Sequence, residues 1–207
     1  MSISEALPAI LAGGGLDTPA AHLSEAEVRQ IAWERYGLTG AFTRFATEKD
    51  DTFRIRTIDG RAFVLKVANP AEQPVEIDFQ IELLRHVERE DPSLPVPRVL
   101  PDREGRLRSD HRAQDGTSRI VRVVSYLEGT PLDSTASSPG ERERVGEVLA
   151  RLRLATATFR HPGEARVLAW DVQHLMQLEP LLAGVEDGGE RRTLAAGLDR
   201  FAALTGG

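Results

Sequence analysis

Lys66 lies in the middle of the stretch GRAFVLKVANPAE, residues 60–72. Its neighbours Leu65 and Val67 belong to a segment with the composition of a buried strand. Burying an unpaired ammonium costs free energy, because the charge loses its hydration. A lysine in such a segment therefore either lies at a sheet edge, where its charged end reaches water, or is paired and has a functional role.

The helix predicted directly afterwards, VEIDFQIELLRHVERE at residues 75–90, offers partners for this ammonium. Apolar residues recur at helical spacing and indicate a buried face. Glu76 and Gln80 fall on or beside that face, and Asp78 is their neighbour. Ordinary solvated helix polarity explains any one of the three equally well, so the partner of Lys66 stays open.

The elements that would position Lys66 form a predicted antiparallel meander. A short strand at 43–46 precedes the polar run TEKDD, the alternating strand TFRIRT and the hairpin signal Asp59-Gly60. RAFVLKVA is then the returning strand, which places Lys66 on the third strand. We expect that strand to be the central or most buried one of the sheet.

Capping signals mark the helices. Ser24 with Glu27 predicts a capping box, and Gly37 ends that first helix. A second capping box, Ser138 with Glu141, opens a helix whose apolar stripe runs from residue 145 to residue 159. Two further helices are predicted at about 172–182 and 190–204.

A strand-rich half followed by a helical half indicates an α+β fold with a hinge near Gly129. The predicted division is an N-terminal arm (1–23), a strand-rich domain (24–128) and a helical part (129–207). Six arginines precede the hinge and could bind an anion, but we interpret them as the solvated side of a hairpin. They are Arg103, Arg106, Arg108, Arg112, Arg119 and Arg122.

Composition excludes several classes of function. The 207 residues carry a net charge of -6, which argues against nucleic-acid binding. The absence of cysteine removes disulfides and thiolate chemistry and suits a reducing cytoplasm. The five histidines are scattered without metal-ligand spacing, and no apolar run approaches the length of a membrane span. We expect a cytoplasmic protein with neither nucleic-acid nor membrane partners.

The order of these motifs resembles the aminoglycoside phosphotransferase/choline kinase superfamily of protein-kinase-like small-molecule kinases. VLKVANPAE, the helix containing DFQ, DPSLPVPRV and AWDV are most similar to its hydroxylysine-kinase-like branch. The resemblance covers about residues 24–185. It implies a kinase N-lobe, made of an antiparallel sheet and one helix, followed by the first helices of a helical C-lobe. In bacteria such domains also occur at the front of longer chains that carry a class III aminotransferase.

The resemblance implies an ATP site. Lys66 would hold the phosphates, Gln80 stands where the superfamily keeps a glutamate, and Val64 would cover the adenine ring. At the hinge, the carbonyl of Ser125 and the amide of Leu127 would contact the base. Magnesium would accompany the nucleotide, with its ligands expected outside this chain.

The loop ATEKDDTF would be the phosphate loop, with Thr47 and nearby backbone amides as contacts. It contains no glycine, and a simple hairpin loop is at least as good an interpretation. Asp50 and Asp51 would be unfavourable beside a triphosphate unless a metal ion or Lys49 intervened.

The catalytic loop of the family, H-G-D-x-x-x-x-N, does not occur in these residues. We therefore expect an N-terminal part of a longer polypeptide that does not transfer phosphate alone. The whole protein would phosphorylate a hydroxyl of an amino-alcohol or amino-acid-like substrate. Two alternatives are a kinase-like module that binds nucleotide without catalysis, and an interaction domain in which Lys66 only pairs with a carboxylate.

Overall fold

The computed structural model describes residues 22–47, 49–165 and 171–206. They fall into two compact units, the first ending at Glu164 and the second beginning at Ala165. The first unit contains a six-stranded sheet with the order β1-β2-β3-β6-β4, in which β5 pairs with β6. The strands are β1 (Ala41–Arg44), β2 (Asp51–Arg56), β3 (Ala62–Val67), β4 (Val99–Leu100), β5 (Ser109–Arg112) and β6 (Ser118–Ser125).

All strand pairs are antiparallel. The turn between β2 and β3 contains Gly60 at φ 85°, a conformation that glycine adopts without strain. The expected α+β class, with an antiparallel meander and β3 between β2 and β6, is confirmed.

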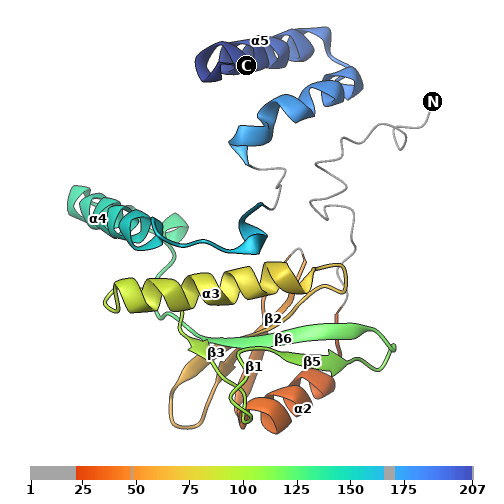
Figure 1. Ribbon diagram of the computed structural model, residues 1–207, viewed down its shortest axis with the longest axis vertical. Coiled ribbons are helices and arrows are strands. Elements are labelled where there is room, and N and C mark those ends of the chain that lie inside the picture. Colours follow the sequence, from red (N-terminus) through yellow and green to blue (C-terminus); the bar gives the residue numbers. More distant parts are fainter. Residues whose placement is uncertain (1–21, 48, 166–170, 207) are drawn as a thin grey trace. The chain divides into compact units, whose positions relative to one another are not determined.

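The helices α2 (Glu25–Tyr36) and α3 (Pro74–Glu90) cover opposite faces of this sheet (Figure 1). Phe63, Leu65 and Val67 lie on one face of β3 and join the core cluster that contains residues of α2. Val64 and Lys66 alternate with them and lie on the other face. Ile77 and Ile81 of α3 pack over the other face. The sheet thus has one face that carries most of the core and one that α3 covers at one end.

The start of α2 corrects one prediction. The hydroxyl of Ser24 accepts the hydrogen bond from the Glu27 amide, as a helix cap should. The Glu27 carboxylate, however, lies 2.8 Å from Nε2 of His111 and accepts a hydrogen bond from the Gln114 amide. The predicted capping box is therefore only half formed, because a long-range contact takes the carboxylate.

The helix α4 (Pro139–Thr156) packs on α3 and has the predicted capping box of Ser138 and Glu141. Ala155 is buried in a cluster with Val87 of α3, whereas Leu149 is 59% exposed. The predicted apolar stripe is thus only partly covered by described residues.

The second unit contains η4 (Val172–Gly184) and α5 (Gly188–Thr205). The first of these is a 3-10 helix rather than an α-helix, begins after the capping residue Asp171 and has Pro180 in its interior. None of the described helices combines the length and the apolar character needed to cross a bilayer.

Candidate functional site

Lys66 is held on the interior strand β3 and not at a sheet edge. Its cross-strand neighbours are Thr52 on β2 and Arg122 on β6. The side chain is 33% exposed, so its stem is covered while its ammonium reaches the polar side of the sheet. The interpretation as an edge lysine is therefore wrong.

Three rows of side chains follow one another on this face of β3 and β6. Ala68, whose amide donates to the Ile120 carbonyl, forms with Ile120 an apolar row under α3. Lys66 and Arg122 form the next row, and Val64 with Val124 the third. Successive rows on one strand face are about 6.6 Å apart. A basic row therefore lies between two apolar ones.

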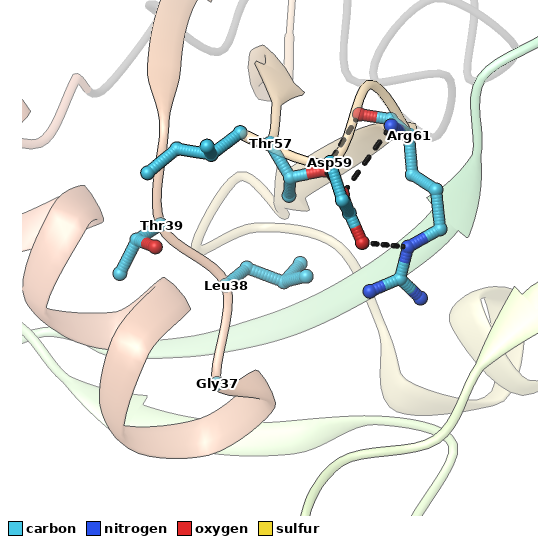
Figure 2. A pocket seen from close by; sticks show the side chains of 7 residues that line it. Gly37, Leu38, Thr39, Thr57, Asp59 and Arg61 are labelled. Atoms are coloured by element: carbon cyan, nitrogen blue, oxygen red, sulfur yellow. Dashed lines mark hydrogen bonds and ion pairs between the residues drawn. The ribbon is translucent and has the colours of Figure 1, made fainter.

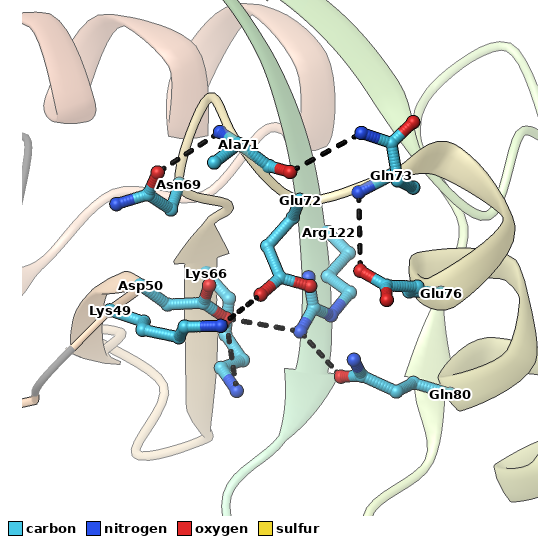
Figure 3. Close-up of polar contacts among 10 residues, drawn as sticks. All are labelled: Lys49, Asp50, Lys66, Asn69, Ala71, Glu72, Gln73, Glu76, Gln80 and Arg122. Atoms are coloured by element: carbon cyan, nitrogen blue, oxygen red, sulfur yellow. Dashed lines mark hydrogen bonds and ion pairs between the residues drawn. The ribbon is translucent and has the colours of Figure 1, made fainter. Parts of the chain in front are cut away.

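A carboxylate joins the two cations of the basic row. Oδ2 of Asp50 lies 3.3 Å from Nζ of Lys66 and 3.2 Å from Nη2 of Arg122 (Figure 3). The same Nη2 donates a hydrogen bond of 2.8 Å to the amide oxygen of Gln80 on α3. Gln80 thus reaches the site from the expected helix, but its partner is Arg122.

Arg122 is the residue that the sequence interpretation missed. The side chain is 3% exposed, and Arg119 is equally buried, so the assignment of these two arginines to a solvated hairpin surface is wrong. Burial lowers the pKa of Arg122, and the nearby carboxylate of Asp50 opposes that shift. The signal was present, since Arg122 lies between Val121 and Val123 just as Lys66 lies between Leu65 and Val67.

The other two candidate partners of Lys66 have different roles. Glu76 completes a capping box at the start of α3 by accepting a hydrogen bond from the Gln73 amide. Asp78 forms a two-pronged contact with the guanidinium of Arg108, at 2.5 Å and 3.1 Å. The ion pair of Lys66 thus comes from the loop before β2 and not from α3.

Besides Asp50, Lys49 also ties the β1–β2 loop to the site. Nζ of Lys49 lies 2.9 Å from the carboxylate of Glu72, which follows β3 (Figure 3). The hydroxyl of Thr47 donates to the carbonyl of Asp50 and closes the loop locally. Glu48 lies outside the described residues.

Asp51 points away from this loop. It is buried, accepts a hydrogen bond from the Leu23 amide and lies 3.2 Å from Nε of Arg44. Of the two aspartates expected to repel a triphosphate, only Asp50 lies beside Lys66. The expected repulsion therefore comes from one carboxylate and not from two.

The hinge segment continues β6. The amide and the hydroxyl of Ser125 are both bonded to the backbone of Arg98, whereas the adenine contact expected there uses the Ser125 carbonyl. Tyr126 stacks on Phe45, with ring centroids 6.5 Å apart, and Leu127 is exposed. Val64 lies one row from Lys66 on the same face of β3.

The hollows of this unit include two open ones. One, of about 570 Å³, is lined by His22, Arg44, Phe45, Ala46 and Thr47, and so adjoins the β1–β2 loop. The other, of about 330 Å³, lies between the end of α2 and the β2–β3 turn (Figure 2). Its polar lining consists of Thr39, Thr57 and the local Asp59–Arg61 ion pair, and none of the expected nucleotide contacts belongs to it.

The described residues offer no single cluster of side chains that would hold a magnesium ion. Among the described residues, no three histidine, cysteine, aspartate or glutamate side chains lie together as metal ligands would. Asp50 is a carboxylate beside the expected phosphates, but both of its close partners are cations.

The geometry is that of a kinase-like fold: an antiparallel sheet, a lysine on its third strand, a helix packed over that face and a hinge after the last strand. The family model "Phosphotransferase enzyme family" matches residues 42–204. The chain therefore belongs to this family of phosphotransferases, and the expected superfamily is confirmed.

A curated relative supports the expected branch. Hydroxylysine kinase of Danio rerio is 31% identical over 153 residues, which cover 71% of this chain. The same alignment covers 42% of the relative, so the chain spans less than half of that protein's length.

Two solved structures have the same fold. An amicoumacin kinase in complex with AMP-PNP, Ca2+ and Ami aligns with a TM-score of 0.60 and 14% identity, over 88% of this chain and 52% of that one. A microcompartment-associated aminopropanol kinase aligns with a TM-score of 0.56 and 20% identity, over 76% and 49%. At these identities the likeness establishes the protein-kinase-like fold.

Proposed function

We propose that this chain is the nucleotide-binding part of a cytoplasmic small-molecule kinase. Lys66 would bind ATP phosphates, Val64 would cover the adenine, and Ser125 and Leu127 would contact it through the backbone. Thr47 and the loop amides would adjoin the phosphates. The observation that carries the proposal is Lys66 itself, a half-buried cation on an interior strand, one row from an apolar residue pair next to the hinge.

The reaction proposed for the whole protein is transfer of a phosphoryl group from ATP to a hydroxyl of an amino-alcohol or amino-acid-like substrate. The relatives support this class, because one is named for hydroxylysine and another for aminopropanol. In such a transfer, magnesium neutralises charge that develops on the phosphates. This chain's residues would position the nucleotide, and residues outside it would hold the metal ion and accept the hydroxyl proton.

The nucleotide site is tested by binding. We expect calorimetry to detect ATP binding to the purified protein and Lys66→Met to abolish it, because the main phosphate cation is removed. Arg85→Met is the matched control: it removes one exposed positive charge on α3, where Arg85 pairs with Glu82, and should bind ATP normally. A protein that does not bind ATP, or a Lys66→Met variant that binds it unchanged, contradicts the proposal.

We also propose that these 207 residues do not transfer phosphate alone, since they contain no H-x-D-x-x-x-x-N loop. ATP hydrolysis by the purified chain should equal the buffer blank, with or without candidate amino-alcohols. Turnover that survives Lys66→Ala at the same rate points to a contaminant, whereas turnover that this substitution abolishes overturns the claim.

A second candidate is a module that binds nucleotide without catalysis inside a larger protein. The contact of Gln80 with Arg122 favours it, because Lys66 then lacks the helix carboxylate that orients the equivalent lysine of protein kinases. The two candidates differ in the longer polypeptide: only a kinase would consume ATP when supplied with a substrate that carries the hydroxyl.

A further inference from the structure

We propose that Asp50 is an internal competitor for the phosphate groups of the nucleotide, and that Arg122 is a second phosphate-binding cation beside Lys66. The inference rests on the proposed nucleotide site and adds to it a residue and a form of control. It assigns to one loop carboxylate the position that phosphate oxygens would take between two cations.

Asp50 bridges two cations on adjacent strands. A single oxygen of Asp50 lies within 3.3 Å of both Lys66 and Arg122, which are directly opposite each other on β3 and β6. Lysine and arginine on adjacent strands of one face form a pair of donors, and a guanidinium suits oxygen anions such as carboxylate and phosphate. The ligand that fits this pair is therefore an oxyanion.

The charges around Lys66 and Arg122 favour an added anion. Three cations, Lys49, Lys66 and Arg122, lie with two carboxylates, Asp50 and Glu72. Within this group, Lys66 and Arg122 share the single close carboxylate of Asp50. Buried charges are costly unless they are paired, so additional negative charge at this place is favourable.

The guanidinium of Arg122 is buried and only partly hydrogen-bonded. Its Nη2 bonds both Asp50 and Gln80, while its Nη1 is buried and has no hydrogen-bond partner within the described part of the chain. A buried donor without a partner carries a penalty that a ligand can remove. Gln80 holds the guanidinium as a neutral acceptor, so it orients Arg122 without reducing the charge presented to an anion.

A ligand can displace the Asp50 carboxylate without breaking the sheet. The ladder of β2 with β3 begins at Asp51, paired with Val67, so Asp50 belongs to the loop. The Asp50 side chain is 15% exposed, and among the described residues the close partners of its carboxylate are the two cations. A triphosphate brings more negative charge than one carboxylate and can replace it.

The test compares four variants for binding of ATP and of inorganic tripolyphosphate, each with Mg²⁺ and with EDTA. Asp50→Asn keeps the size and removes the competing charge, so both ligands should bind roughly tenfold more tightly. Arg122→Gln should weaken both by a similar factor, and Arg122→Lys should retain part of the affinity. Asp59→Asn, an exposed hairpin carboxylate paired with Arg61, is the matched control and should equal the wild type.

The outcomes separate this inference from the proposed function. If the wild type binds ATP and Asp50→Asn binds it equally or more weakly, Asp50 is not a competitor and the inference is overturned. Weakening by Asp50→Asn only with Mg²⁺ would assign the carboxylate to the metal ion and overturn it too. If the affinities of the variants for tripolyphosphate follow the expected order but ATP binds no more tightly than tripolyphosphate, the inferred anion site is supported and the proposed nucleotide site is contradicted. Circular dichroism identifies a variant that does not fold. If Arg122→Gln does not fold, the comparison of Arg122→Lys with the wild type tests the role of Arg122.

Discussion

Lys49 and Lys66 are the only lysines of the sequence, and both reach carboxylates at the candidate site. Arginine supplies every other permanent side-chain cation, including the buried Arg122. This division has a physical reason. An ammonium on a flexible stem can change partners at little cost, whereas a planar guanidinium fixed by Gln80 keeps its direction. Lys66 is therefore suited to follow a moving ligand and Arg122 to fix its position.

The carboxyl group of Asp102 makes the stability of the protein depend on pH. Burial acts to raise its pKa, but hydrogen bonds from the Ser109 hydroxyl, from Arg106 and from the Glu104 amide outweigh burial and lower the pKa to about 2. The folded pKa is below the unfolded value of 3.8. The carboxylate thus stabilises the fold above about pH 4, and this contribution is lost as the pH falls through 4 towards 2.

We therefore expect Asp102→Asn to lower the free energy of unfolding at pH 7 and to flatten its decline between pH 4 and pH 2.5. Urea unfolding at several pH values measures both effects. Asp110→Asn, at a largely exposed carboxylate in the neighbouring strand, is the control and should keep the wild-type slope. Equal slopes for wild type and Asp102→Asn would contradict the assignment.

At the scale of elements, the turn after α4 packs closely on α3. A Cβ built on Gly163 would lie 2.9 Å from Cβ of Phe79 and 2.9 Å from the Val75 carbonyl. Phe79 also meets Phe159 edge to face, with ring centroids 5.5 Å apart. The close packing of residues 159–163 on α3 therefore requires a residue without a side chain at position 163.

Gly163→Ala should destabilise the protein by about 1–3 kcal/mol, because backbone and a packed ring must move. Gly146→Ala, on α4 with nothing within 4 Å, should instead stabilise it by about 0.5–1 kcal/mol, since alanine favours the helix. If the close contact exists, chemical denaturation will show that the two substitutions change the free energy of unfolding in opposite directions. A Gly163→Ala variant as stable as the wild type would exclude it.

The elements also show what sequence could reveal. Strand alternation, the Asp59-Gly60 turn and the helix caps are local signals, and they predicted the meander, α3 and the place of Lys66 on β3. Pairings across the chain are not local. Asp50 and Arg122 are 72 residues apart, and Glu27 and His111 are 84 apart. No periodicity specifies such partners, so neither the pairing of Arg122 with Asp50 nor the contact that takes Glu27 from the first capping box was predictable.

For the molecule as a whole, buried apolar residues concentrate in the first unit. Its three core clusters extend from Leu23 to Ala155 and join the sheet to α2, α3 and α4. In the described helices of the second unit, η4 and α5, no residue is buried. Most of the hydrophobic stabilisation therefore belongs to the first unit.

This distribution predicts that a chain cut after Glu164 folds and retains the nucleotide site. Every residue expected to contact ATP, from Thr47 to Leu127, precedes the cut, and so does each core cluster. We expect one cooperative urea transition with a free energy of unfolding within about 1 kcal/mol of that of the 207-residue chain, because the removed helices bury little. Calorimetry should give the same ATP affinity for both. A truncated chain that unfolds without cooperativity would show that residues beyond 164 complete the core, while a folded one that has lost ATP binding would place part of the site there.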